Sequence, residues 1–480
     1  MQEDSRQKRT RPPLQFVPST LIAVFAIVAL VGLGMQRGLW AFMVLAPFGA
    51  AAAFNLPALG GATIGVLDLG AVTLFCMVLL TRGMMSSLLG TFRPFGPGFW
   101  LACAIVVAGI SAIFYPVLFA GQTEVFGIAR QEGEGRIARY PLGFSTGNIT
   151  QLFRLVLDFF TFAALATAFR RQSEVRPVLT ALAVATTVNF TLGWLDVATA
   201  KFGLTALMEW LRSANYSMHI TDTMAGMKRM IGGFPEASTF GYFSLGLFGF
   251  WLQYWLLAPG SRLSRWMLAL ATISVIRSTS SAAYLALVVF LVTFGLYLIL
   301  RNLRAEASRR SIVLVFGGLI MGWVLVIAIA ASYELVQPVT DFLDRALFNK
   351  MDSDSGVERM SWNTQAMQNF YDTYGLGAGV GAVRASNWLI ACLASVGVIG
   401  TFFFLAFLAS LGMAPSRPGW DPRAVVVRSL KAGCLAMLCA ALLTHPTPDF
   451  GVFFFALAGL IAGLSRALAL ESRPAGATTT

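Results

Sequence analysis

Residues 239–258 read TFGYFSLGLFGFWLQYWLLA, a stretch without a single charged side chain. A helix of about twenty apolar residues is long enough to cross the roughly 30 Å hydrocarbon core of a membrane. Backbone groups in lipid must be paired within the protein, so we expect this stretch to form a helix rather than a strand.

The whole chain has the same character. Of its 480 residues, 57% are hydrophobic and 12% are charged, and the mean hydropathy is +0.71. A soluble globular chain carries about 25% charged residues, so half that share cannot cover a water-facing surface of this size. The sequence therefore predicts an all-α polytopic integral membrane protein.

The predicted topology follows from the apolar runs and the basic segments between them. The runs lie at 18–35, 39–54, 62–81, 99–119, 149–169, 177–198, 237–258, 266–279, 281–300, 311–333, 387–411, 429–444 and 450–470. Short basic connections at 82–93, 170–176, 262–265, 301–310 and 417–428 are assigned to the cytoplasm by the positive-inside rule. We expect about twelve transmembrane helices, a retained first helix and both termini inside.

One feature conflicts with this topology. A cytoplasmic N-terminus and a cytoplasmic Arg82 require an even number of crossings between them, yet the runs 18–35, 39–54 and 62–81 precede Arg82. The 39–54 run, which contains Pro47, is the weakest of the three. It is expected to be re-entrant or fused with a neighbour.

The topology divides the chain into seven segments. They are a cytoplasmic N-terminal tail (1–17), N-terminal transmembrane helices (18–198), an extracytoplasmic loop (199–236), central transmembrane helices (237–333), a large extracytoplasmic loop (334–386), C-terminal transmembrane helices (387–470) and a cytoplasmic tail (471–480). The net charge of +12 partly reflects the inside loops, and no nucleic-acid partner is expected. The five cysteines all lie in apolar runs, and we interpret them as buried hydrophobes.

The first long outer loop ends in KRMIGGFPE, residues 228–236. Arg229 supplies a forked, permanently charged donor suited to phosphate oxygens, and Lys228 adds a second cation. The adjacent Gly232 and Gly233 would let backbone N–H groups approach an anion closely, and Glu236 could orient Arg229 or accept a proton. The alternative is a tight turn with a snorkelling cation at a helix end.

The second long outer loop carries another polar pattern. A polar segment leads to Arg359 and, one turn later, Trp362, followed by the glycine-rich GLGAGVG at 375–381. Arg384 and Asn387 then precede the return into the membrane. Long ordered loops are usually functional, so this loop is expected to be more than a connection.

In this order the motifs resemble the Wzy-type polysaccharide polymerases and O-antigen ligases of bacterial envelopes. The resemblance covers residues 229–400. Its parts are Arg229, Gly232 and Glu236 before a helix, the Ser/Thr-rich IRSTSSAAYLAL at 276–287, and Arg359, Trp362, GLGAGVG, Asn387, Gly397 and Gly400. Many members have a histidine directly before the late asparagine, but this chain has Ser386 there. The difference favours a polymerase over a ligase and leaves the identity of the base open.

The resemblance implies a GT-C-like, multi-pass protein of the bacterial inner membrane. It implies transfer of a growing glycan from a polyprenyl pyrophosphate carrier to an acceptor sugar on another carrier lipid, with inversion at the anomeric carbon. The implied partners are polyprenyl-pyrophosphate-linked oligosaccharide and membrane lipids, with a chain-length regulator and a flippase as further partners in the same membrane. No cofactor is expected.

Fixed arginines would then stabilise the pyrophosphate leaving group without a metal ion, for which the sequence offers no grouped ligands. Arg229 and Arg359 are predicted to bind the pyrophosphate, with Lys228 and Arg277 as additional cationic contacts. Glu236 is the first candidate for the general base, with an orienting or helix-capping role as the alternative. The further substrate-binding candidates are His219, Gly232, Gly233, Trp362, Arg384 and Asn387.

Several ionisable residues lie within or near predicted spans. Arg154 and Asp158 are four residues apart and are expected to pair on one helix face. Together with Asp68 and Asp196 they would either line the entrance for the lipid or hold helices together. His445 would either face a cavity or pack at a helix end.

Two other functions remain open at this point. A ligase would move finished glycan to another acceptor. A flippase or transporter of lipid-linked sugars would have paired structural halves and broken helices near the midplane. We find no internal repeat, and the distinctive polar residues cluster in the outer loops.

Overall fold

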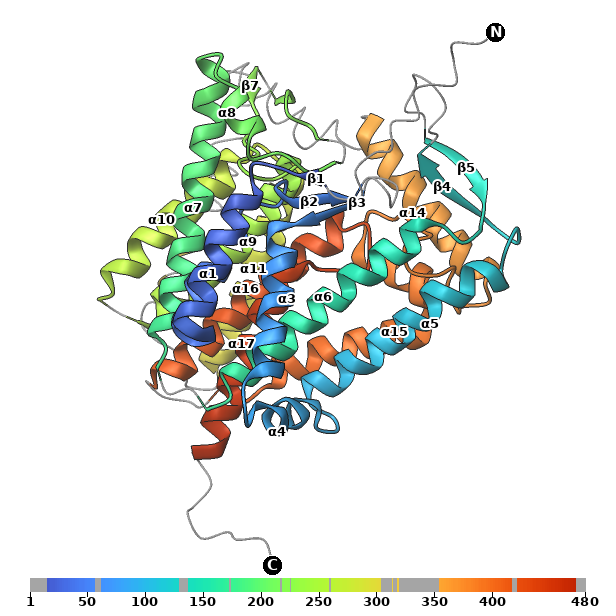
Figure 1. Cartoon of the computed structure of the whole chain (residues 1–480). Coiled ribbons are helices and arrows are strands. Elements are labelled where there is room, and N and C mark those ends of the chain that lie inside the picture. Colours follow the sequence, from blue (N-terminus) through green and yellow to red (C-terminus); the bar gives the residue numbers. More distant parts are fainter. Residues whose placement is uncertain are drawn as a thin grey trace, which may run out of the picture.

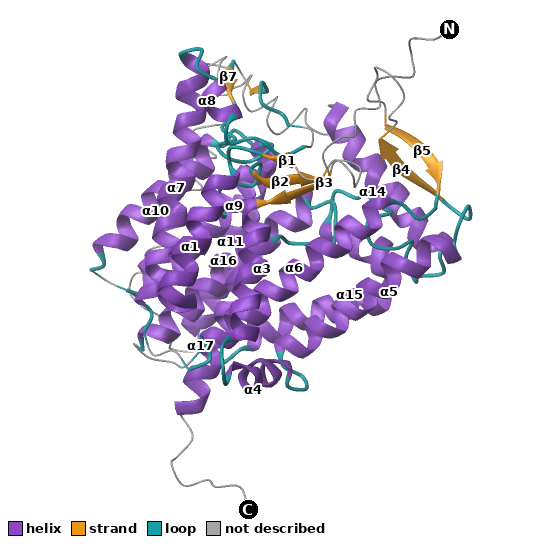
Figure 2. Cartoon of the chain, viewed as in Figure 1, coloured by secondary structure: helices purple, strands orange, loops and turns teal. Residues whose placement is uncertain are grey.

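The computed structural model describes residues 15–56, 62–128, 137–171, 174–215, 218–224, 226–258, 260–303, 313, 317–318, 354–416 and 421–471. These residues form a bundle of long helices, and the strands gather at one end of it (Figures 1 and 2). We call this end the loop end. The last helix finishes at the opposite end, beside a short helix that lies across the bundle (Figure 1).

The helices are α1 (Thr20–Arg37), α2 (Leu39–Met43), α3 (Val66–Leu80), α4 (Met84–Leu89), the 3₁₀ turn η2 (Gly90–Phe92), α5 (Pro97–Leu118), α6 (Thr146–Ala168), α7 (Arg176–Lys201), α8 (Ala206–Glu209), α9 (Ala237–Leu257), α10 (Arg262–Arg277), α11 (Ser281–Leu303), α14 (Asp354–Asp372), α15 (Trp388–Met413), α16 (Pro422–Thr444) and α17 (Val452–Glu471). The strands are β1 (Gln15–Phe16), β2 (Ala52–Leu56), β3 (Ala62–Gly65), β4 (Glu124–Ile128), β5 (Ile137–Pro141), β6 (Thr223–Met224) and β7 (Met227–Lys228). They form an antiparallel β1–β2–β3 sheet and two hairpins.

The chain has the helices of a multi-pass membrane protein. Among the described residues, eight helices are long and apolar enough to cross a membrane, namely α1, α5, α6, α7, α11, α15, α16 and α17. A ninth candidate is the α3–α4 pair, which is bent by 117°. Of the expected spans, 237–258 forms α9, which is not among these candidates, and 266–279 forms the shorter helix α10. The expected span 311–333 lies outside the described residues apart from single positions.

The helix α9, which contains the uncharged stretch 239–258, lies inside the bundle and packs against α10, α11 and α16. Most of its residues are buried, so its apolar side chains surround the helix instead of forming one stripe. A Cβ on Gly249 would lie 2.7 Å from the Ala432 carbonyl oxygen, so glycine allows the close approach of α16. The Trp251 indole N–H donates to Thr186 (2.8 Å), which pairs a polar atom deep in the bundle.

The 39–54 run is not a spanning helix. It forms the short helix α2, a series of turns and the start of β2. At one end, Gln36 donates to the Ala168 carbonyl at the end of α6, and at the other, the Ala50 N–H donates to the Gly233 carbonyl in the first loop. The segment therefore returns from the opposite end of the bundle to the loop end.

This return changes the expected sidedness of the N-terminus. β1 pairs with β2, so Gln15 lies at the loop end, together with the segment 199–236, whereas Glu471 ends α17 at the opposite end (Figure 1). The three runs before Arg82 thus each traverse the bundle. The conflict in the sequence came from expecting the N-terminus on the same side as Arg82, whereas the described chain starts at the loop end and reaches Arg82 after these three passes.

The glycine-rich segment 375–381 holds the second loop against the bundle. Gly375, Gly377, Gly379 and Gly381 all have positive φ. The N–H of Ala378 donates to the Ala394 carbonyl and that of Gly379 to the Ser395 carbonyl, both in α15. A Cβ on Gly381 would lie 2.3 Å from the Gly147 carbonyl oxygen at the start of α6. The amides of Ala378 and Gly379 are therefore used to attach the segment to α15.

Candidate functional site

A cavity of about 650 Å³ lies at the loop end of the bundle. Its walls come from the turn at 46–49, the start of α3, the first half of α6, residues 234–243 and the α16–α17 connection at 444–453. Arg384 of the second loop completes the lining. The cavity therefore joins both loops that the sequence singled out to helices from each third of the chain.

The ionisable side chains of this cavity include more carboxyl groups than arginines. They comprise two arginines, four carboxyl groups, a histidine and a tyrosine: Arg154, Arg384, Asp68, Asp158, Glu236, Asp449, His445 and Tyr242. Aromatic side chains, including Phe234, Phe243 and Phe450, line other parts of the wall. Carboxylates that accept hydrogen bonds from hydroxyls, next to aromatic faces, suit a carbohydrate better than a purely apolar ligand.

Glu236 occupies the N-cap position of α9 and has an extended backbone, with φ −152° and ψ 161°. Its Oε1 accepts hydrogen bonds from the hydroxyls of Ser238 and Thr239. The positive end of the α9 dipole also favours a carboxylate here. The carboxylate is thus held in place at the cavity wall, as required of both a general base and an orienting group.

Arg384 joins the second loop to this site. Its guanidinium lies 4.3 Å from the centre of the Trp362 ring on α14, and Glu236 and Glu358 interact with it electrostatically. A planar guanidinium stacked on an indole retains its in-plane donors for other partners. Of the predicted substrate-binding residues, Trp362 and Arg384 are therefore brought together beside Glu236.

Asn387 has a structural role in this arrangement. It is the N-cap of α15, and its side-chain oxygen accepts hydrogen bonds from the N–H groups of Leu389 (2.9 Å) and Ile390 (3.2 Å). Its amide donates to the Leu442 carbonyl at the end of α16 (2.6 Å). The side chain fixes the start of α15 against α16, and both its oxygen and its nitrogen form hydrogen bonds within the protein.

A group of carboxyls lies between α3, α6 and the α16–α17 connection. Asp158 of α6 is 1% exposed and interacts electrostatically with Asp449, Asp68 and Arg154. Asp449 accepts hydrogen bonds from the Gln151 side chain (3.3 Å) and the Gly451 N–H. The sequence raised Arg154, Asp158 and Asp68 as lining residues, and the cavity contains all three.

His445 also lines the cavity. The sequence had left open whether this residue faces a cavity or packs at a helix end. Its ring packs on Tyr242, with 4.9 Å between the ring centres, and the Tyr242 hydroxyl donates to the Phe450 carbonyl (3.0 Å). Burial lowers the pKa of His445 below its ordinary value, and the opposing effect of Asp449 offsets this only in part. The neutral imidazole is therefore favoured near pH 7.

Lys228 and the paired glycines belong to the attachment of the first loop. The Lys228 Nζ lies 2.7 Å from Asp196 Oδ1 on α7, and Arg212 Nη2 lies 2.5 Å from the same oxygen. Arg212 also donates to the Gly232 carbonyl (2.7 Å). A Cβ on Gly233 would lie 2.3 Å from the Pro47 carbonyl oxygen. Asp196 thus holds elements together, and Lys228 does not line the cavity.

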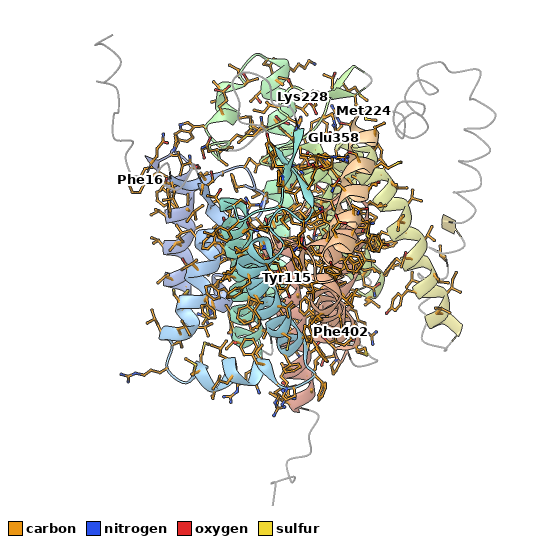
Figure 3. The ribbon with its side chains drawn as sticks, turned by 90° about the vertical axis from the view of Figure 1, so that its right-hand side faces the viewer. Phe16, Tyr115, Met224, Lys228, Glu358 and Phe402 are labelled. Atoms are coloured by element: carbon orange, nitrogen blue, oxygen red, sulfur yellow. The ribbon has the colours of Figure 1, made fainter. Side chains whose placement is uncertain are left out.

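Arg229 and His219 both contact Asp222 within the first loop. Arg229 Nη1 lies 3.5 Å, and His219 Nδ1 3.6 Å, from Asp222 Oδ2. Arg277 at the end of α10 donates to the Lys228 carbonyl (3.3 Å). Arg229, His219 and Arg277 belong to the loop end, where Figure 3 labels Lys228 and Glu358, but they are not among the lining residues of the cavity.

Arg359 lies on α14, one turn before Trp362, and is likewise not part of the cavity lining. The expected pair of Arg229 and Arg359 is therefore not assembled in this cavity, where the arginines are Arg154 and Arg384. Asp449 and Tyr242 were missed by the sequence analysis. The short polar segment THPTPDF at 444–450 lies between two apolar runs. This pattern indicates a connection between two helices and is the feature of the sequence from which Asp449 could have been considered.

No group of three or more metal-ligating side chains is assembled among the described residues. No protein-family model matches the chain, and no curated protein is significantly similar to it.

Proposed function

We propose that the protein is a membrane glycosyltransferase that polymerises polyprenyl-pyrophosphate-linked oligosaccharide units into an exopolysaccharide, capsule or O-antigen. One observation carries the proposal: a single cavity at the loop end joins Glu236 of the first loop to the stacked Arg384 of the second. The order of the loop motifs, with the resemblance that it carries, supports the same function. The acidic and aromatic lining fits a sugar substrate.

The distribution of charged residues in the cavity suggests which of them would bind the sugar and which the pyrophosphate. Carboxyl groups outnumber arginines in the lining, so the inner cavity is unsuited to a pyrophosphate and suited to sugar hydroxyls. The exposed, forked Arg384 is the group for the pyrophosphate. This assignment replaces the pair of Arg229 and Arg359 that the motifs alone suggested.

In the proposed reaction, a hydroxyl oxygen of the acceptor sugar attacks the anomeric carbon of the donor sugar. The bond from that carbon to the pyrophosphate oxygen breaks, and polyprenyl pyrophosphate leaves with the electron pair. Glu236 accepts the hydroxyl proton, and Arg384 stabilises the charge that develops on the leaving group. His445, neutral and in the same cavity, is the second candidate for the base.

A flippase or transporter is the alternative from a different class. A broken helix, one of its expected features, is present, because α15 has non-helical backbone at Gly397. The break is filled by protein, since a Cβ on Gly397 would lie 2.3 Å from the Leu376 carbonyl oxygen. It does not line the cavity, so this feature does not favour a transport path. The missing histidine before Asn387 continues to argue against the ligase.

The test uses a strain that lacks the gene and carries wild type, Glu236→Gln or the control Glu209→Gln, an exposed residue of α8. Polymer and lipid-linked intermediates are measured together with the protein level in the membrane. We expect Glu236→Gln to lose polymer and to accumulate single repeat units outside, while Glu209→Gln behaves as wild type. Intermediates trapped on the cytoplasmic face in the strain without the gene would instead indicate a flippase.

A further inference from the structure

A second cavity, of about 410 Å³, lies at the opposite end of the bundle. It is formed by the α4–α5 connection, the end of α6 and the ends of α15 and α17. Three arginines line it, Arg93, Arg170 and Arg466, and no carboxylate is among its described lining residues. Three cationic side chains that line one cavity favour an anion there.

Arg170 is fixed in place before any ligand binds. Its Nη1 donates to the Ser87 carbonyl (2.8 Å), and its guanidinium lies over Gly90, where a Cβ would be 2.0 Å from Nη1. Burial and the positive charges of Arg93 and Arg171 lower the pKa of Arg170. A cation held next to other cations, over a glycine that makes room for it, resembles a preorganised anion site.

The mouth of this cavity is apolar. Phe95 and Met413, both lining residues, are each 76% exposed, and Phe95 has a φ of 61°, which is unusual for a residue other than glycine. The neighbouring Trp100 packs edge-on against Phe402, which Figure 3 shows toward this end of the bundle. Aromatic side chains at the end of a bundle are typical of the membrane interface.

We propose that this cavity binds an anionic phospholipid, with the headgroup phosphate among the three arginines and the acyl chains over Phe95 and Met413. A free phosphate would use the same arginines but would leave the apolar mouth uncovered, so the lipid is the ligand that matches both parts. Arginines at this end are also expected from topology, but topology alone does not require three of them to share one cavity. The site is separate from the cavity of the proposed reaction and does not depend on it.

The experiment measures the thermal unfolding of the purified full-length protein in detergent with added phosphatidylglycerol, phosphatidylcholine or inorganic phosphate. We expect phosphatidylglycerol to raise the melting temperature of the wild type more than the other two additives do. Arg93→Gln, Arg170→Gln and Arg466→Gln should each weaken the lipid effect by about fivefold in midpoint concentration. Arg262→Gln, an exposed arginine at the same end outside this cavity, is the matched control and should behave as wild type.

Two further results keep the proposal testable if an arginine variant folds poorly. Ala462→Phe keeps all three arginines but fills the cavity, and it should also abolish the selective effect of phosphatidylglycerol. Native mass spectrometry of the wild type should retain phosphatidylglycerol in preference to phosphatidylcholine. Equal retention of the two lipids, an equal effect of inorganic phosphate, or an unchanged lipid effect in the folded variants would overturn the proposal.

Discussion

Asp196 shows how a charged residue within a helix can serve the structure of a loop. Its side chain is 1% exposed, and it accepts hydrogen bonds from Lys228, Arg212 and the Ile231 N–H. A buried carboxylate is stable only when its charge is compensated in this way. The basic start of the KRMIGGFPE motif is therefore explained in part by its attachment to α7, whereas Glu236 at its end faces the cavity.

His445 makes the stability of the protein depend on pH. The unfolded chain protonates this histidine near pH 6.5, whereas the folded protein, in which its pKa is lowered, does so only at lower pH. Between these two values the unfolded state binds more protons, so stability should fall as the pH is lowered. His445→Phe, which preserves the ring packing on Tyr242, should flatten the fall in melting temperature between pH 7 and the lowered pKa.

The control for this measurement is the only other histidine of the chain, His219, which is largely exposed in the first loop. His219→Phe should leave the dependence of melting temperature on pH as it is in the wild type. The account would be contradicted if the melting temperature of the His445 variant still fell with pH as in the wild type, or if this fall disappeared in the His219 variant. The burial of His445 would then not cause the pH dependence of stability.

At the scale of elements, the helices could be predicted from the sequence and their connections could not. The length of an apolar run predicts the ends of a helix such as α7 or α17 to within a few residues. The reason is that backbone N–H and C=O groups in lipid can form hydrogen bonds only within the protein. The segment 39–54 has similar composition but ends in β2, whose partners β1 and β3 cannot be recognised in an apolar run. Likewise, the amides of GLGAGVG could serve a ligand or a helix, and only the position of α15 decides between them.

The contact between the glycine-rich segment and the break in α15 gives a prediction about Gly397. Its φ is +66° and a Cβ there would lie 2.3 Å from the Leu376 carbonyl oxygen, so Gly397→Ala should destabilise the protein by about 2 kcal/mol or more. Arg384, which follows the same segment, should be displaced and activity should fall. The readouts are the melting temperature and the rate of polymer formation.

Gly412→Ala is the matched control, because it lies in the same helix with no atom within 4 Å of the added Cβ. It should be neutral or slightly stabilising. If both variants had the same melting temperature and activity, the close contact between the second loop and α15 at Gly397 would be contradicted.

At the scale of the molecule, the two described ends of the chain lie at opposite ends of the bundle, which makes a prediction about sidedness (Figure 1). In a cysteine-free variant, we expect Gln15→Cys and His219→Cys to react with an impermeant thiol reagent from the same side of the membrane. Ser86→Cys in α4 should react only from the other side. Labelling of positions 15 and 86 from one side would contradict the path of residues 38–51.

The candidate site was predicted in part. Glu236 is the N-cap of α9 and Arg384 lies shortly before α15, so the sequence could place both at a boundary between a loop and a helix, whereas Trp362 lies within α14. The grouping of Arg154, Asp158 and Asp449 depends on the packing of α6 beside α17, which no local pattern encodes. For the same reason the sequence could not show that Arg384, and not Arg359, is the arginine that the second loop contributes to the cavity.

The central claim is that one cavity joins Glu236 to Arg384, and the most direct test compares Arg384→Gln with Arg359→Gln. Purified protein in vesicles receives lipid-linked repeat units, and the rate of chain extension is measured for both variants and for Arg384→Lys. We predict a loss of about a hundredfold or more for Arg384→Gln, a partial loss for Arg384→Lys and little change for Arg359→Gln. Full activity of Arg384→Gln together with an inactive Arg359→Gln would contradict the account.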